Sequence, residues 1–129
     1  MQRQVIATAG APPAIGPYSQ AIACGELVFC SGQIALDPQN GQLVVGDVAA
    51  ETRQVMHNLG EVLRAAGSDF GRVVKCTVFL TDLRDFAAVN EVYGQCFATA
   101  PPARACVQVV ALPKGARVEV EAIALRAAG

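Results

Sequence analysis

The chain has one histidine, His57, and no tryptophan among its 129 residues. The helical period of the surrounding segment places His57 on the polar side of a predicted helix, as is typical of a solvated residue. A catalytic triad or a metal site that uses histidine therefore has no support. Any proton transfer must depend on a carboxylate, a thiol, a phenol or water.

Several binding motifs are missing as well. No segment has Gly-x-x-x-x-Gly-Lys or Gly-x-Gly-x-x-Gly spacing, so phosphate-binding and dinucleotide-binding loops are not indicated and no cofactor is expected. The cysteines are odd in number and have no Cys-x-x-Cys spacing, which favours reduced, buried thiols over a disulfide framework or a metal site. They are Cys24, Cys30, Cys76, Cys96 and Cys106.

The chain also lacks an excess of positive charge and a long apolar run. Ten Lys and Arg stand against eleven Asp and Glu, so a nucleic-acid partner is not favoured. No run approaches the roughly 20 apolar residues of a membrane span. The first 20 residues, interrupted by Pro12, Pro13 and Pro17, resemble neither a secretory signal nor a transit helix. We expect a cytoplasmic protein without a membrane partner.

Two segments have the period of amphipathic helices. Residues 47–67 carry apolar side chains at helical spacing, with Asp47 as a candidate N-cap and Gly67 as the end. Residues 81–97 have a second apolar stripe, and Asp82 is the predicted start of that helix.

The remaining apolar segments alternate as strands do. Four strands are predicted, over residues 26–34, 72–81, 103–110 and 117–125. Residues 37–42, DPQNGQ, form a predicted turn or exposed loop. With no repeat and no linker, residues 1–129 read as a single α/β domain.

Two helices can cover only one face of such a sheet. On the last strand Val118, Val120, Ala122 and Ala124 suit packing under helices, whereas the opposite side mixes charged with apolar groups. That side comprises Arg117, Glu119, Glu121, Ile123 and Leu125. A face of this kind is too apolar for water and too charged for a core, so it predicts contact between copies of the chain.

Polar side chains occupy positions where the pattern calls for apolar ones. Asn90 lies inside the stripe of the second helix, where it either lines a cleft or caps or bridges a strand end. Arg104 follows two prolines on a predicted strand and either binds a ligand or pairs with Glu119 or Glu121. Cys106, on the same face as Arg104, is more typical of packing than of a nucleophile.

Two further segments are candidates for a pocket. Tyr18 lies after a Gly-Pro turn and before a strand, where it suits pocket lining and edge packing equally. Gly32, in the segment CSGQI, leaves room for a ligand carboxylate or another subunit to approach the backbone.

Taken in order, five segments resemble the successive motifs of the RidA family, also called YjgF/YER057c/UK114, and they cover nearly the whole chain. They are AIGPYSQA, SGQI, TVFLTDLRDFAAVNEVY, PPARACVQV and VEVEAIAL. The resemblance implies an α+β, chorismate-mutase-like fold, with a mixed six-stranded sheet and two helices on one face. It also implies a homotrimer with clefts between subunits, and 2-iminobutanoate/2-iminopropanoate deaminase activity.

The resemblance assigns roles residue by residue. The carboxylate-binding arginine falls on Arg104 and the acidic residue on Glu119, while the other pocket residues fall on Tyr18, Ser31, Asn90 and Cys106. The chain departs from the pattern before Pro-Ala-Arg, where relatives often have an aromatic residue and this chain has Pro101-Pro102.

The predicted chemistry is simple. Arg104 can bind the carboxylate of a 2-imino acid through two parallel N–H bonds, and Glu119 can orient a water molecule and carry protons. Two alternatives stay open: a module that binds small carboxylates without turnover, and an RNA-degrading or translation-inhibiting protein, against which the acidic composition speaks.

The distance between Arg104 and Glu119 predicts a site shared between chains. If the last two strands form a hairpin, the two residues lie about 13 Å apart along it. If another strand separates them, their backbones are still about 10 Å apart. A four-carbon imine is smaller than either gap.

Overall fold

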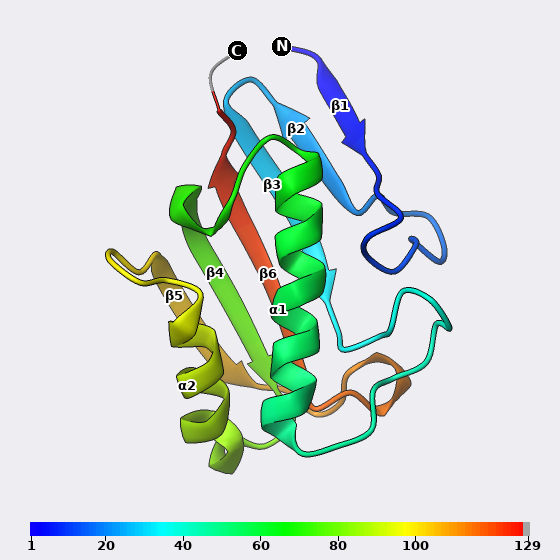
Figure 1. Ribbon diagram of the computed structural model, residues 1–129, viewed down its shortest axis with the longest axis vertical. Coiled ribbons are helices and arrows are strands. Elements are labelled where there is room, and N and C mark those ends of the chain that lie inside the picture. Colours follow the sequence, from blue (N-terminus) through cyan, green and yellow to red (C-terminus); the bar gives the residue numbers. More distant parts are fainter. Residues whose placement is uncertain (128–129) are drawn as a thin grey trace.

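The computed structural model describes residues 1–127, and its centre is one mixed six-stranded sheet (Figure 1). The strand order is β1-β2-β3-β6-β4-β5, with β4 and β5 parallel and all other neighbours antiparallel. The strands are β1 (Arg3–Ile6), β2 (Ala21–Cys24), β3 (Leu27–Gln33), β4 (Val73–Leu80), β5 (Ala103–Gln108) and β6 (Val118–Leu125). The sequence pattern predicts the last four of these. The first two have four residues each, which is too short for a clear alternation.

Both α-helices lie on the same face of the sheet, as the resemblance implies (Figure 1). The longer, α1 (Val48–Ala65), crosses the middle of the sheet, and α2 (Phe86–Gln95) lies beside β5. Three short 3₁₀ turns complete the regular structure: η1 (Phe70–Arg72), η2 (Leu83–Asp85) and η3 (Pro113–Gly115).

The predicted ends of α1 are confirmed, whereas the start of α2 is not. Asp47 Oδ1 accepts the Ala50 N–H at 2.9 Å, and Gly67 adopts a φ of 78° just beyond the helix. Asp82 instead accepts the N–H of Arg84, only two residues further on, and this bond belongs to the tighter turn η2. The α-helical hydrogen bonding therefore begins later, at Phe86.

The two faces of β6 differ as predicted. Val118, Val120, Ala122 and Ala124 are buried beneath the helices. On the other face Phe29 of β3 and Leu125 of β6 remain 43% and 41% exposed, so this side of the sheet, which we call the open face, presents apolar groups at the surface.

Arg117 corrects the predicted membership of the open face. It precedes β6, and its Nε donates to Glu51 Oε1 at 2.8 Å on the helix-bearing side. The alternation of a strand does not constrain a residue outside it, and the buried carboxylate of Glu51 attracts the guanidinium.

The segment from 109 to 117 is a crossover rather than a hairpin turn. It carries η3 and returns the chain to β6, which pairs with β3 and β4 but not with β5. The hairpin alternative for the last two strands is therefore wrong, and β4 separates the strands of Arg104 and Glu119.

Candidate active site

The guanidinium of Arg104 is held by three residues of α2. Its Nη1 donates to Asn90 Oδ1 at 2.6 Å, and its Cζ lies 5.0 Å from the ring centroid of Tyr93 and 5.5 Å from that of Phe86. These three residues follow helical spacing, so one face of α2 forms the support. The arginine side chain is exposed, and the bond to Asn90 is its one hydrogen bond within residues 1–127. Most of its N–H donors are therefore available to a ligand.

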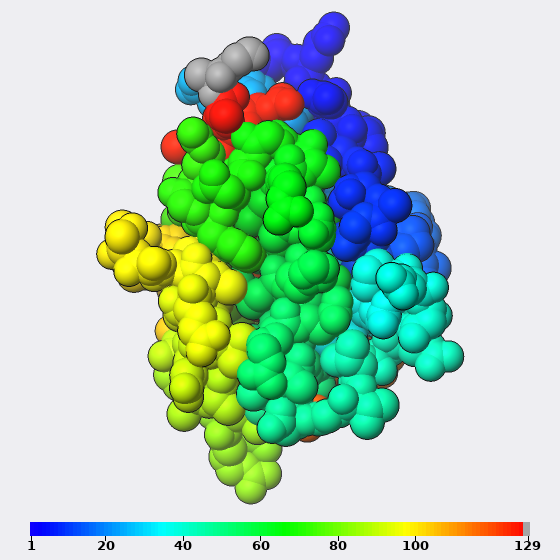
Figure 2. Space-filling model, viewed as in Figure 1, coloured from blue at the N-terminus to red at the C-terminus, as the bar shows by residue number. Residues whose placement is uncertain are grey.

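Arg104 borders a hollow of about 460 Å³ at the edge of the sheet. Pro101 and Pro102 form one wall of this hollow, and Figure 2 shows their segment, in yellow, standing out beside α2. Asn90 lines the same hollow. Asn90 therefore lines a cavity and also bridges α2 to the start of β5, so the two alternatives for its position do not exclude each other.

Glu119 lies in a different depression, a groove of about 560 Å³ that also involves Tyr18, Ser31 and Gly32. The backbone there is irregular, because the β3–β6 register shifts between Cys30 and Gln33. A Cβ added to Gly32 would overlap Oε2 of Glu119. The position of an added Cβ is therefore occupied by the Glu119 carboxylate of the same chain, and Gly32 also lines the groove.

Burial raises the pKa of the Glu119 carboxyl, and the nearby charge of Glu121 raises it further. Such a carboxyl is protonated over a wider range of pH than an exposed one, and it can give and take protons closer to neutrality.

The loop that carries Tyr18 is fixed to the sheet by two polar side chains. Ser31 Oγ donates to the carbonyl of Ser19 at 2.6 Å. Gln20, which is buried, accepts the N–H of Thr8 at 2.7 Å and donates to the carbonyl of Pro12 at 2.8 Å. Tyr18 itself is 52% exposed, with its hydroxyl 3.3 Å from the N–H of Ile15. Sequence analysis missed Gln20, whose signal is a glutamine directly before the buried alanines of β2.

Arg104 and Glu119 lie on opposite faces of the sheet. Arg104 is level with Cys76, a buried residue of the helix-bearing face, whereas Glu119 points to the open face. Their backbones are about 14 Å apart, from two strand spacings and three residues along the strands. The pairing of Arg104 with Glu119 or Glu121 within one chain is therefore wrong, and neither carboxylate forms an ion pair within residues 1–127.

The predicted site residues thus divide into two groups. The structure brings Asn90 and Arg104 together, and it brings Tyr18, Ser31, Gly32 and Glu119 together. Cys106 is half-buried on β5 and lines neither depression. Burial raises the pKa of its thiol, although Arg104 opposes this, so Cys106 suits packing better than nucleophilic attack.

Burial also raises the pKa of the thiols of Cys30, Cys76 and Cys96. Burial raises the pKa of Cys30 to about 12, with a smaller contribution from Cys76. All five cysteines are unpaired. Within the described part of the chain, no three His, Cys, Asp or Glu side chains converge as metal ligands would.

Comparison with known proteins places the chain in a family. The profile of the family described as Endoribonuclease L-PSP matches residues 8–126. The 2-iminobutanoate/2-iminopropanoate deaminase of Homo sapiens is 56% identical over 124 residues, which cover 96% of this chain and 90% of the human protein. Protein DfrA of Myxococcus xanthus is 58% identical over 97% of each chain.

Solved structures agree with this assignment. The crystal structure of E. coli TdcF with bound serine superposes with a TM-score of 0.91 at 46% sequence identity, over 96% of this chain and 99% of TdcF. The chain thus has the α+β fold of proteins of the L-PSP type. This chain belongs to that family, which is also called the RidA family.

Proposed function

We propose that the protein hydrolyses 2-iminobutanoate and 2-iminopropanoate to 2-keto acids and ammonia. The main observation is Arg104, an exposed guanidinium held by Asn90 and two aromatic rings at the edge of a hollow. Its free donors suit a small carboxylate. The name of the human relative and the serine in the TdcF crystal, itself an α-carboxylate, support this substrate class.

The reaction requires one water molecule and no change in oxidation state. Water adds its oxygen to the imine carbon and loses a proton to the Glu119 carboxylate. Glu119 then returns this proton to nitrogen, takes the remaining hydroxyl proton and passes it to nitrogen in the same way, so that the carbonyl forms, the carbon–nitrogen bond breaks, and ammonia and a 2-keto acid are released. A carboxyl whose pKa is raised toward neutrality suits both steps.

The site is shared between neighbouring chains of a homotrimer. Arg104 and Glu119 lie on opposite faces of one chain and about 14 Å apart, so a four-carbon substrate cannot reach both within it. A neighbour that covers the apolar open face can bring its own Arg104 hollow against the Glu119 groove on that face. Each cleft then contains one half from each of two chains.

Mixed trimers test this arrangement. Arg104→Ala and Glu119→Gln chains, each inactive alone, should regain activity in about a quarter of the sites when co-refolded in equal amounts, because the mutations lie in different halves. Arg104→Ala mixed with Asn90→Ala is the matched control and should show no gain over the average activity of the two variants alone, since both changes lie in one half. Mixed trimers that form without activity would exclude the shared site.

Ammonia release tests the activity itself. An amino-acid oxidase or threonine dehydratase generates the imine in situ, and added protein should accelerate the appearance of ammonia. In a module that only binds carboxylates, Glu119→Gln would retain full ligand affinity and there would be no turnover to lose. RNA cleavage with a steep dependence on salt would instead favour an endoribonuclease function, as the family's description suggests.

We place the protein in the cytoplasm, because its unpaired thiols suit a reducing compartment. Within residues 1–127, no helix is long and apolar enough to cross a membrane.

A further inference from the structure

Two of the fully buried polar residues of helix α1 bind backbone groups outside the helix. Glu51 is 2% exposed and Asn58 is 0% exposed, amid apolar neighbours such as Val55 and Leu59. They are seven residues apart, so they lie two turns apart on one face of the helix. Packing alone would favour apolar side chains at both positions.

Glu51 binds the backbone at the start of β6. Its Oε2 accepts the N–H of Arg117 at 2.6 Å and that of Val118 at 3.3 Å. Its Oε1 accepts Nε of Arg117 at 2.8 Å, and Nη2 of the same guanidinium donates to the carbonyl of Gly46 at 2.6 Å. The carboxylate therefore fixes the two residues that directly precede Glu119.

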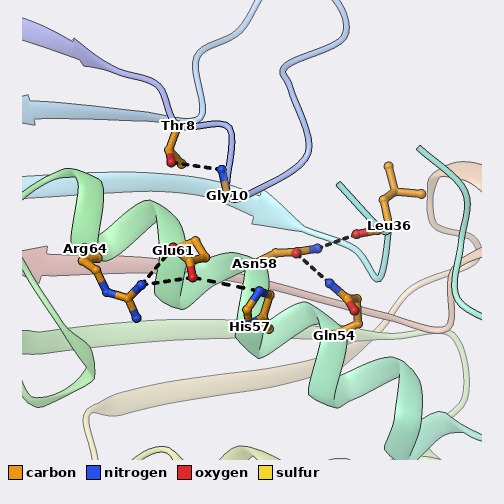
Figure 3. A network of polar contacts seen from close by, with 8 residues as sticks. All are labelled: Thr8, Gly10, Leu36, Gln54, His57, Asn58, Glu61 and Arg64. Atoms are coloured by element: carbon orange, nitrogen blue, oxygen red, sulfur yellow. Dashed lines mark hydrogen bonds and ion pairs between the residues drawn. The ribbon is translucent and has the colours of Figure 1, made fainter. Parts of the chain in front are cut away.

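Asn58 binds the backbone just beyond β3. Its Nδ2 donates to the carbonyl of Leu36 at 2.9 Å and to that of Ile34 at 3.2 Å. Gln54 donates to its Oδ1 at 2.9 Å and so holds the amide in this orientation. Figure 3 shows Asn58 reaching from α1 to Leu36, with the side chain of Gln54 below it.

The two bound segments are the walls of the Glu119 groove where strand pairing ends. The last registered pair of β3 with β6 is Gln33 with Val120. Beyond it, Ile34 and Leu36 line one side of the groove and Glu119 the other. In this region side chains of α1 bind both walls where the β3–β6 ladder is missing, and the Glu119 wall also pairs with β4 through Val118 and Glu119.

We propose that Glu51 and Asn58 are positioning residues that fix the separation of the two groove walls and thereby hold the Glu119 carboxylate against Gly32. This inference deepens the proposed function and rests on it. Neither residue touches the substrate, and each acts through the backbone that it binds. A displacement of about 1 Å at a catalytic group can cost on the order of a hundredfold in rate, so loosening either wall affects turnover.

Two variants of similar shape test the proposal. Glu51→Gln replaces one acceptor oxygen by an NH₂ group, which cannot accept from Arg117. Asn58→Leu keeps the branched shape but removes both donors to the 34–36 segment. The control is Thr52→Val, since Thr52 is also 0% exposed on α1 but donates only to the carbonyl of Val48 within the helix.

The readouts are kcat and KM for imine hydrolysis, together with amide hydrogen exchange. Glu51→Gln and Asn58→Leu should each lower kcat at least about tenfold and change KM less than about threefold, because Arg104 of the other half still binds the carboxylate. Exchange should accelerate at residues 117–119 in the first variant and at 34–36 in the second. Thr52→Val should change kcat less than about twofold, even where its melting temperature falls.

The inference is overturned if exchange accelerates in the walls while kcat stays within about twofold of the Thr52→Val value. It is also overturned if exchange in the walls does not change. Failure of the proposed function gives a different result, because the wild-type protein then releases no ammonia from any imine. In that case hydrogen exchange at residues 34–36 and 117–119 alone tests whether α1 holds the groove walls.

Discussion

The two halves of the candidate site are built in different ways. Arg104 lies at an exposed edge, and side chains of one short helix support it. Glu119 lies in a half-buried groove whose walls are held through their backbone by buried polar groups. The first half offers charge to a ligand from solvent, and the second keeps a carboxyl partly shielded from it.

This difference shows how binding and proton transfer can be separated in one small protein. A guanidinium stays charged wherever it lies, so Arg104 needs only orientation. The proton affinity of a carboxyl depends on burial, so Glu119 needs an enclosing backbone. Substitutions in the two halves should therefore affect different kinetic constants.

The largest effect is expected from Glu119→Gln. The amide keeps the size of the side chain but cannot carry a proton, so kcat should fall about a thousandfold while KM changes little. Steady-state ammonia release checks this. Glu121→Gln, on the same face, should retain most of the activity, and an equal loss there would contradict the assignment to Glu119.

Arg104→Lys changes the carboxylate-binding half of the site, and its loss of activity should be somewhat smaller than that of Glu119→Gln. A lysine keeps the charge but cannot form two parallel bonds to a carboxylate, so kcat/KM should fall about a hundredfold. Kinetics at low substrate concentration measure this. Arg84→Lys, which alters an exposed ion pair with Asp82, is the matched control and should have no effect. Near-wild-type activity of Arg104→Lys would contradict the proposal that Arg104 binds the substrate carboxylate.

Gly32→Ala should lower kcat about tenfold with little loss of stability, because the new methyl group meets only the end of the flexible Glu119 side chain. A double-mutant cycle sharpens this. If Gly32 acts through Glu119, Gly32→Ala should cost nothing further in the Glu119→Gln background. Additive losses would mean that Gly32 contributes independently.

Asn90→Ala removes an exposed support of Arg104, and kcat/KM should fall about fivefold, since the two rings still hold the guanidinium. The melting temperature should change little because the side chain is at the surface. Calorimetry beside kinetics separates the two effects. A lower melting temperature with unchanged turnover would assign Asn90 to packing alone.

The smallest effect concerns stability and pH. The pKa of Glu119 is raised in the folded chain, so its contribution is fully present below the unfolded pKa and is lost as pH rises through the folded value. Relative to Glu119→Gln, the free energy of unfolding of the wild type should therefore decrease between pH 4 and pH 8. Urea unfolding of both proteins across this range measures the difference. A wild-type free energy of unfolding that increases with pH relative to Glu119→Gln would contradict the raised pKa.

Much of the fold could be predicted because its signals are local. The alternation in β6 separates Val118 and Val120 from Glu119 and Glu121, and Asp47 and Gly67 delimit α1 through their own backbone preferences. The start of α2 could not be predicted in this way, because Asp82 caps a tighter turn that has a similar sequence signature.

The candidate residues were also visible in the sequence, but their grouping was not. Which strands become neighbours depends on long-range pairing, and the insertion of β4 between β5 and β6 determines how far Arg104 is from Glu119. Asn58 and Glu51 were overlooked for the same reason, since their partners are 22 and 66 residues away.

The sequence by itself determined the types of chemical group, the strand and helix periods, and the family motifs. Only the tertiary structure decided that Arg104 and Glu119 face opposite sides of the sheet, that the Glu119 carboxylate fills the space above Gly32, and that α1 holds both walls of its groove. The physical reason is that side-chain identity and period depend on neighbours along the chain. In contrast, the faces of the sheet on which Arg104 and Glu119 lie depend on which distant segments pack together. The burial that raises the pKa of Glu119 depends on the same packing.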